Sequence, residues 1–486
     1  MPVDEVDRLR RRLAAAGPRL YVGVGALGMA FADPQQAVLV LGPPRSGKTT
    51  ALVIPNVLAA PGAVISTSTK LDVMGATVRT RSALGRCWLL DPTGTVPAPA
   101  GVTPLRWSPA MAATDWDESL ITSRAMVTAA RPGATRGEAA HWTERAEALV
   151  APLLHAAAIG GADMRTVARW VLRQDLDPAR AILTGHGVAL AADVLAGLAA
   201  TDPREMSGIW STAAGVLSAY RSEAALAAAE APNLDPRSIA LGTDTVYVCA
   251  PARSQALVAP IVVAFLEQVR AGAYRAAGRR STPDAALPVT LALDELANIA
   301  PLPDLPAMVS EGGGQGVLTL ACLQDLSQAR ARWAVEAEGF MSLFGTKVVL
   351  PGIGDLATLE LVSRLGGEVD VPHRSISQGP WWGPGRGAAT VSWVPRRQRR
   401  LPVDAVNQLA TGTAVVLAGR ERPAMVRLPP WWAAAPFAPH LSAALPGCDP
   451  PGGAPSPARA PDRAPDEKKA GAPRTRLRAR GRGVEM

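Results

Sequence analysis

The sequence has few cysteines, and they lie far apart. Its 486 residues contain four, at positions 87, 249, 322 and 448, and none has a partner at metal-ligand spacing. This pattern argues against a disulfide-stapled scaffold or a zinc module and indicates reduced thiols in an intracellular protein. The five histidines are dispersed as well, and no Ser-His-Asp order emerges. Chemistry based on a triad or a His/Cys metal cluster is therefore not predicted.

Apolar runs of membrane-spanning length are also lacking. The best candidate, residues 20–32, is glycine-rich and well short of the roughly 20 residues that a spanning helix needs. It lacks a signal-peptide cleavage pattern. It could be a remnant of a membrane helix, an interfacial segment or a strand, and we expect a soluble protein without a transmembrane helix.

Aromatic residues make up only 4% of the chain, whereas hydrophobic residues make up 48% and alanine is abundant. Such a composition is typical of a globular protein with helix-rich parts, and the length allows about two or three domains. The net charge of +8 is carried almost entirely by arginine. It is compatible with a nucleic-acid or anionic-membrane partner but equally with GC-rich codon usage, so it is weak support.

What the chain does have is a glycine loop, GPPRSGKT (residues 42–49), between an apolar run at 37–41 and a predicted helix at 51–60. Strand, loop and helix start are the context in which G-x-x-x-x-G-K-[ST] binds polyphosphate. Lys48 would reach the β- and γ-phosphates, and Thr49 would ligate Mg²⁺. The alternative is an ordinary Gly/Pro turn. The residues expected to hold ATP are Gly42, Arg45, Ser46, Gly47, Lys48, Thr49 and Thr50.

A second motif supplies the acids that such a loop requires. An apolar run at 289–293 ends in Asp294 and Glu295. Asp294 would bind the metal through water, and Glu295 would polarise the attacking water as general base. Adjacent strand residues point to opposite faces, so the exit of the strand must bend for both to serve. The alternative is a pair of ordinary surface acids.

Gln324 follows the next buried run, 317–323. A neutral amide there can orient water or sense the γ-phosphate. A helix-capping role is about equally compatible with the sequence.

Strands alternating with helical stretches predict an α/β fold with a mostly parallel sheet. The expected strands are 37–41, 63–66, 86–90, 245–249, 289–295, 317–323, 347–350 and 413–418. Helical periodicity without β-branched runs predicts an inserted all-α domain at 108–235. The α/β domain would then comprise 37–107 and 236–440. Residues 1–36 are expected to be an N-terminal helical segment, and 441–486 a disordered Pro/Arg-rich tail.

Residues 379–400 are rich in tryptophan, glycine and arginine and are expected to be loop-like. Their aromatic and basic side chains could form a stacking and backbone platform for nucleic acid. A solvated basic loop is the alternative. The residues concerned are Trp381, Trp382, Trp393, Arg396, Arg397, Arg399 and Arg400.

Three blocks resemble the TraG/TraD-type coupling proteins of conjugation and type IV secretion: LGPPRSGKTT (41–50), LALDELANIAPLPDLPAMVSEGGGQG (291–316) and LACLQDLSQARARW (320–333). The similarity covers residues 37–432. The resemblance implies a RecA-like P-loop motor that uses ATP and Mg²⁺ and assembles as a hexamer. Lys48 and Thr49 fall in the Walker A role, Asp294 and Glu295 in Walker B, and Gln324 in the sensor motif.

In this family, ATP hydrolysis moves DNA or a relaxase–DNA complex toward the secretion channel, and the inserted domain faces the cargo. The resemblance therefore implies a cytoplasmic location at the inner or plasma membrane. These proteins usually begin with transmembrane helices, so we expect a truncated or soluble relative recruited by a membrane-anchored partner. An FtsK-like DNA translocase and a hydrolysis-poor docking adaptor for relaxase or protein cargo are the rival functions.

Many relatives have an arginine where Gln315 follows the glycine run of this chain. If that arginine serves a neighbour's nucleotide, another residue must do so here. Arg330, Arg332 and Arg364 are the candidates.

Overall fold

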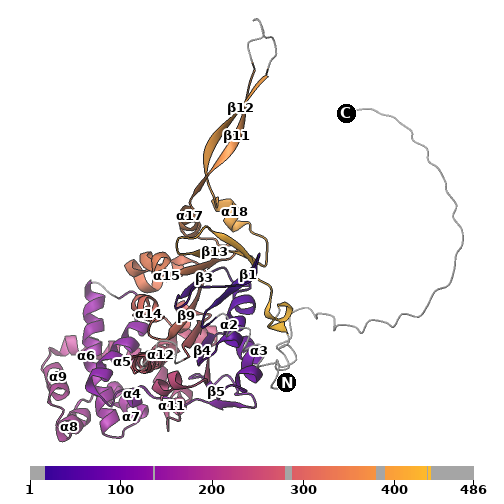
Figure 1. Cartoon of the computed structure of the whole chain (residues 1–486). Helices are drawn as coiled ribbons and strands as arrows, with labels where there is room; N and C mark the ends of the chain where they lie inside the picture. The colour runs from indigo at the N-terminus through magenta and orange to yellow at the C-terminus, as the bar shows by residue number, and fades with distance from the viewer. Residues whose placement is uncertain (1–16, 135–136, 280–286, 379–388, 435, 439–486) are drawn as a thin grey trace, which may run out of the picture. The chain divides into compact units, whose positions relative to one another are not determined.

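The computed structural model describes residues 17–134, 137–279, 287–378, 389–434 and 436–438. Its centre is a twelve-stranded sheet with the order β2-β1-β14-β13-β10-β3-β9-β8-β4-β7-β5-β6 (Figure 1). The strands from β10 to β6 are mutually parallel, and those from β13 to β2 pair antiparallel. In chain order they are β1 (Tyr21–Gly25), β2 (Gly28–Phe31), β3 (Val38–Leu41), β4 (Val64–Ser68), β5 (Cys87–Leu90), β6 (Val102–Pro104), β7 (Thr245–Cys249), β8 (Val289–Leu293), β9 (Val317–Leu323), β10 (Thr346–Val349), β13 (Thr413–Ala418) and β14 (Ala424–Arg427).

The central strands β3, β4, β7, β8 and β9 are buried at every position because both faces of the sheet are covered. In β3, Leu39 and Leu41 pack into a core that includes α12 (Gln255–Gly278), whereas Val38 and Val40 pack into a second core with α2 (Ile54–Ala59). Period-two alternation thus sorts one apolar run into two cores. The predicted α/β fold with a mostly parallel sheet is confirmed.

The prediction of a helical segment over residues 1–36 is wrong for its described part, because β1 and β2 form a hairpin whose first strand pairs with β14. Tyr21 is 1% exposed and packs edge-to-face against Phe31 and Phe437. Its backbone N–H donates to the Asn56 side chain at 2.8 Å. Of the three alternatives for residues 20–32, the strand is correct. Residues 1–16 lie outside the described part of the chain.

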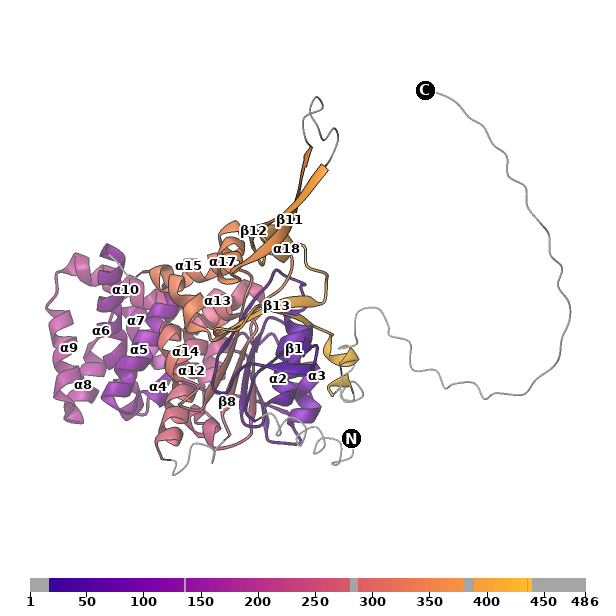
Figure 2. The ribbon, with the colours of Figure 1, turned by 45° about the horizontal axis from the view of Figure 1, so that its top comes forward.

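Every regular element described between β6 and β7 is helical, and all but the last of them lie within residues 108–235, the range predicted for the inserted all-α domain (Figure 2). Helix α5 packs against both α6 and α12. The Gln268 side chain of α12 donates to the Glu118 carboxylate of α5 at 3.3 Å, so the contact between these helices includes polar groups. The domain boundaries at residues 108 and 235 stay a prediction. These elements are α4 (Pro109–Ala112), α5 (Trp116–Ala130), α6 (Gly137–Ile159), α7 (Met164–Arg173), α8 (Asp177–Gly185), α9 (Ala189–Ala199), α10 (Pro203–Val216), η2 (Ser218–Arg221), α11 (Glu223–Ala229) and η3 (Pro236–Leu241).

Among the described residues, one helix is long and apolar enough to cross a membrane, Ala252–Gly278, which comprises η4 (Ala252–Ser254) and α12. Within the protein, 78% of the most apolar 18-residue stretch of this helix is buried. It packs against α5, η3 and the short helix α13 (Leu296–Ile299). A core helix passes the same test of length and composition, and α12 has the contacts of a core helix.

The remaining helices flank the sheet or connect its strands. They are η1 (Thr49–Val53), α3 (Asp72–Arg81), α14 (Leu305–Glu311), α15 (Leu326–Trp333), η6 (Ala334–Gly339), α16 (Phe340–Leu343), α17 (Leu356–Leu365), α18 (Val403–Asn407) and η7 (Trp431–Ala433).

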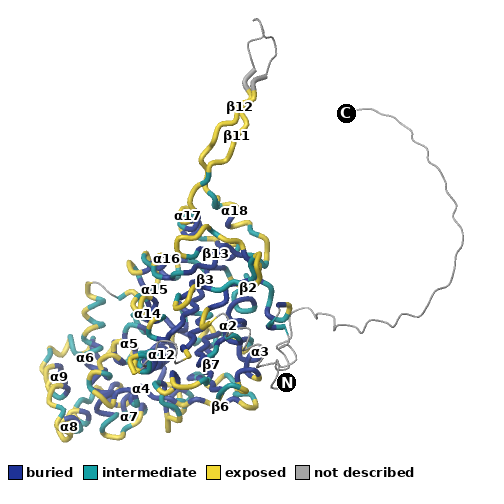
Figure 3. Tube along the Cα trace, in the orientation of Figure 1, coloured by how far each residue is buried: buried dark blue, intermediate teal, exposed yellow. Residues whose placement is uncertain are grey.

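The prediction of a loop over residues 379–400 is wrong for the second half of this range, which forms a strand. Strands β11 (Glu368–Gln378) and β12 (Ala389–Arg399) form a separate antiparallel ribbon (Figure 3). Arg374 lies opposite Trp393, which is 64% exposed, and Arg397 pairs with Glu368 at 2.6 Å. Eleven consecutive cross-strand pairs override the loop-like composition. Trp381, Trp382 and the predicted disordered tail at 441–486 lie outside the described residues.

Candidate nucleotide site

The glycine loop joins the carboxyl end of β3 to η1 and needs its two glycines for different reasons. Gly47 has a φ of 97°, a conformation that favours glycine. At Gly42 a Cβ would lie 2.8 Å from the Ser46 hydroxyl oxygen and 2.9 Å from the Leu350 Cβ. Arg45 also has a positive φ, of 64°. Gly42 thus allows the loop to pack closely against Ser46 and Leu350, and Gly47 allows its turn.

Two groups of the loop have the properties that a polyphosphate requires. The Lys48 ammonium donates to the carbonyl oxygens of Gly42 at 2.5 Å and Pro43 at 2.9 Å, so it lies folded over the loop. The Ser46 hydroxyl is buried without a hydrogen-bond partner among the described residues. A buried hydroxyl without a partner is costly, and an anion seated in the loop would relieve that cost. These residues fit the phosphates of ATP.

The helix after the loop begins at Thr49, earlier than predicted, with the π-helical turn η1 before α2. Thr50 donates its hydroxyl to the Gly47 carbonyl at 3.3 Å, within the loop. Thr49 instead donates to the Asp294 carboxylate at 2.7 Å. The structure therefore brings together the hydroxyl and carboxylate that the sequence assigned to Mg²⁺. Such hard oxygen ligands fit that ion.

The pKa of Asp294 is raised from 3.8 to about 6, chiefly because the carboxyl group is buried. The nearby carboxylates of Asp72 and Glu295 raise it further, while the Thr49 hydrogen bond and the Lys48 charge lower it. Burial and like charge favour the neutral form, and the bond and the ammonium favour the ion. A bound divalent cation would also favour the ionised form and so lower the pKa of Asp294.

This pKa makes the stability of the nucleotide-free protein depend on pH. The folded protein holds the Asp294 proton more tightly than the unfolded chain, so this contribution to stability is full below about pH 4 and is lost as pH rises through about 6. An amide side chain cannot ionise, so Asp294→Asn should gain stability over wild type as pH rises from 4 to 7.5, by at most about 3 kcal/mol. Thermal unfolding across this range is the measurement.

Asp193→Asn, which neutralises an exposed carboxylate on α9, is the matched control and should show no such trend. A stability difference between Asp294→Asn and wild type that stays constant with pH would contradict the assignment.

The exit of β8 bends as the chemistry requires. The strand ends at Leu293, and both Asp294 and Glu295 line one cavity of about 280 Å³ with Lys48, Thr49 and Gln324. The Gln324 side chain is accompanied by Gln328, whose amide oxygen accepts the Gln324 backbone N–H at 2.8 Å. The cavity also includes Lys70 and Asp72, which sequence reasoning missed because they follow a different strand, β4.

A chain of hydrogen bonds leads away from Glu295. Its carboxylate accepts from the Asn298 amide at 2.5 Å, and the Asn298 oxygen accepts from the Arg332 guanidinium at 3.0 Å. Sequence reasoning missed Asn298, although its position three residues after Glu295 in a helical turn is a usable signal. Arg332 also lines a second cavity, of about 340 Å³, together with Arg124 of α5 and Glu147 of α6.

The three arginines considered for a neighbour's nucleotide all have partners within this chain. Arg332 contacts Asn298, Arg330 pairs with Asp355 at 2.8 Å, and Arg364 lies 3.7 Å from Glu360. Arg330 and Arg332 follow the carboxyl end of β9, at the edge of the sheet that carries the chain's own glycine loop. Arg332 is therefore placed to act on its own site.

The fold and site define a RecA-like P-loop nucleotide-binding protein, in which the loop strand β3 lies between β10 and β9 and the acid-bearing strand β8 lies next to β9. More particularly, the chain belongs to the family of type IV secretory system conjugative DNA transfer proteins, whose model matches residues 4–433. The resemblance to TraG/TraD-type coupling proteins is thereby confirmed.

Solved structures of similar fold include the bacterial conjugative coupling protein TrwBdeltaN70 in an unbound form. It has a TM-score of 0.66 and 20% identity, over 87% of this chain and 92% of that one. The plasmid coupling protein TrwB in complex with ADP and Mg²⁺ has a TM-score of 0.64 and 19% identity, with the same coverage. No curated protein matches this chain.

Proposed function

We propose that this conjugative coupling protein is a Mg²⁺-dependent ATPase that moves DNA, or a relaxase–DNA complex, toward a type IV secretion channel. The observation that carries the proposal is the Thr49–Asp294 hydrogen bond, which joins the glycine loop to the acid-bearing strand. Membership of the conjugative DNA transfer family supports DNA as the partner. We further propose a hexamer and a membrane-anchored partner at the cytoplasmic face of the membrane.

The residues of the chain divide the reaction among them. Lys48 would move from the loop carbonyls to the β- and γ-phosphates, which also receive the loop N–H groups from Arg45 onward. Thr49 and Asp294 would hold Mg²⁺, which when bound neutralises charge that develops on the phosphates. Glu295, held by Asn298, would accept a proton from the attacking water, and Gln324 would orient that water. TrwB, solved with ADP and Mg²⁺ and with the GTP analogue GDPNP, supports nucleotide and magnesium here.

Steady-state ATP turnover of the purified chain, with and without single-stranded or duplex DNA, tests the proposal. We expect turnover that requires Mg²⁺ and rises when DNA is added. ATP binding without turnover, in the presence of either DNA, would contradict the motor function. That result would favour a docking adaptor that uses nucleotide only for assembly.

A further inference from the structure

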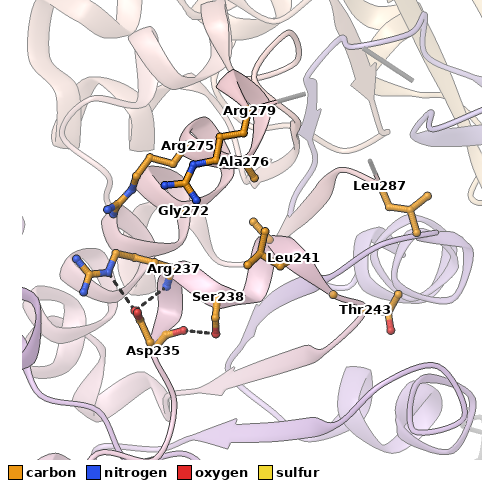
Figure 4. Close-up of a pocket in the computed structure, with 12 residues that line it drawn as sticks. Asp235, Arg237, Ser238, Leu241, Thr243, Gly272, Arg275, Ala276, Arg279 and Leu287 are labelled. Carbon is orange, nitrogen blue, oxygen red and sulfur yellow. Dashed lines mark hydrogen bonds and ion pairs between the residues drawn. The ribbon is translucent and has the colours of Figure 1, made fainter. Parts of the chain in front are cut away.

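An arginine-lined cavity lies away from the nucleotide site. It has a volume of about 790 Å³ and is lined by residues of η3, by the turn that enters β7, by the end of α12 and by Leu287 (Figure 4). These residues precede β7 and β8 or lie beside their amino ends, whereas the glycine loop follows the carboxyl end of β3. Because these strands are parallel, the two sites occupy opposite edges of one sheet.

The cavity carries an excess of positive charge. Three arginines line it, at positions 237, 275 and 279, against one acid, Asp235. Arg237 donates its Nε–H to Asp235 at 3.1 Å. Arg275 donates its Nε–H to the Ala271 carbonyl at 3.2 Å, and its guanidinium lies 3.8 Å from Glu118. The Arg279 backbone N–H donates to the Ala277 carbonyl, but its guanidinium forms no hydrogen bond or ion pair with another described residue. Most guanidinium N–H groups at the cavity thus remain available to an anion.

Close packing and hydrogen bonds fix the backbone around this cavity. Gly272 lets α12 approach η3, since a Cβ there would lie 2.3 Å from the Arg237 carbonyl oxygen. The buried Arg81 guanidinium donates to the Thr243 carbonyl at 3.1 Å, and the Thr243 hydroxyl donates to the Leu84 carbonyl at 2.5 Å. These contacts fix the turn that enters β7. The arginines therefore project from a rigid frame.

The form of the cavity favours a chain of phosphates over a single small anion. Its volume of about 790 Å³ is far larger than the 280 Å³ of the nucleotide cavity. Arg275 and Arg279 lie one helical turn apart, about 6 Å along the helix axis. Such a spacing suits successive phosphates. Leu241 and Leu287, 77% and 47% exposed, add apolar surface beside the arginines. Sugars and unpaired bases can lie on such a surface, whereas a free phosphate gains nothing from it.

We infer that this arginine-lined cavity binds the phosphodiester backbone of single-stranded nucleic acid. The inference rests on the proposed function, because it identifies where the DNA partner contacts the chain. It adds a contact site at the edge of the sheet opposite the glycine loop. Arg275 and Arg279 supply the phosphate contacts, and the exposed leucines contact the sugars and bases.

The test is binding of a fluorescein-labelled oligothymidylate to the full chain, measured by anisotropy over a range of salt concentrations. The double variant Arg275→Gln/Arg279→Gln should bind about 10-fold more weakly at moderate salt. The slope of log K against log salt should fall in magnitude by about 1.4, at about 0.7 for each lost phosphate contact. The matched control is Arg169→Gln/Arg173→Gln, which removes two exposed arginines at the same spacing from α7. It should bind like wild type.

Binding by Arg275→Gln/Arg279→Gln that equals the control would overturn the inference. A second arm uses inorganic tripolyphosphate. If the double variant loses tripolyphosphate binding but keeps oligothymidylate binding, the cavity takes a small anion and the nucleic-acid assignment is wrong. ATP turnover without DNA should stay unchanged in both double variants. A wild-type chain that binds no DNA would overturn the proposed function as well, which separates the two failures.

Discussion

Glu295→Gln is expected to bind ATP as tightly as wild type and to hydrolyse it at least about 100-fold more slowly. Glutamine keeps the shape of glutamate and an oxygen that can accept the Asn298 hydrogen bond. It cannot take a proton from water, so the loss falls on the chemical step rather than on binding. Steady-state turnover and equilibrium binding of a fluorescent ATP analogue separate the two effects.

Glu360→Gln is the matched control for this variant. It makes the same chemical change at a partly exposed carboxylate on α17, 3.7 Å from Arg364, and should leave turnover unchanged. If Glu295→Gln keeps turnover within a fewfold of wild type, Glu295 is not the general base. If it loses ATP binding instead, its role is in holding the nucleotide or the metal.

Lys48→Ala is expected to lower the affinity for ATP by about 10- to 100-fold. A charge-assisted hydrogen bond to phosphate contributes about 1.5–3 kcal/mol, and the lysine ammonium already lies at the mouth of the loop. Its removal also leaves the Gly42 and Pro43 carbonyls without this donor. Titration of the fluorescent analogue, with Mg²⁺ present, measures the effect.

The comparison variant is Arg79→Ala, which truncates an exposed cationic side chain on α3 and should bind ATP like wild type. Equal affinities of Lys48→Ala and wild type would show that the loop does not hold the phosphates in the proposed manner.

The parts of this fold that could be predicted from the sequence are those that a short, continuous stretch of residues specifies by itself. The buried strands β7, β9 and β13 begin and end at the predicted residues, because apolar runs bounded by turn residues need no distant information. The glycine loop is equally local. The meeting of Thr49 with Asp294, 245 residues apart, follows once both motifs are assigned to the carboxyl edge of one parallel sheet.

The errors arose where pairing with a distant strand decides the structure. The first strand, β1, pairs with β14, some 400 residues later in the chain, and no local sequence pattern predicts this pairing. The β12 sequence alternates in strand fashion, but its proline, arginines and tryptophan indicate a loop until its pairing with β11 is known. Asn298 and Arg332 come from separate helices, and the arginine-lined cavity from three segments. Such sites exist only after tertiary packing.

The chain of hydrogen bonds from Glu295 through Asn298 ends at Arg332, in a cavity shared with α5 and α6 of the helical insertion. One end of this chain of bonds is at the proposed hydrolytic site, and the other faces helices that we propose to contact the cargo. A cargo that binds preferentially to one position of Arg332 would change the free energy of the hydrolysis-ready state. By thermodynamic linkage, the nucleotide state would then change cargo affinity by the same factor. The same coupling free energy would therefore govern both the loading and the release of cargo.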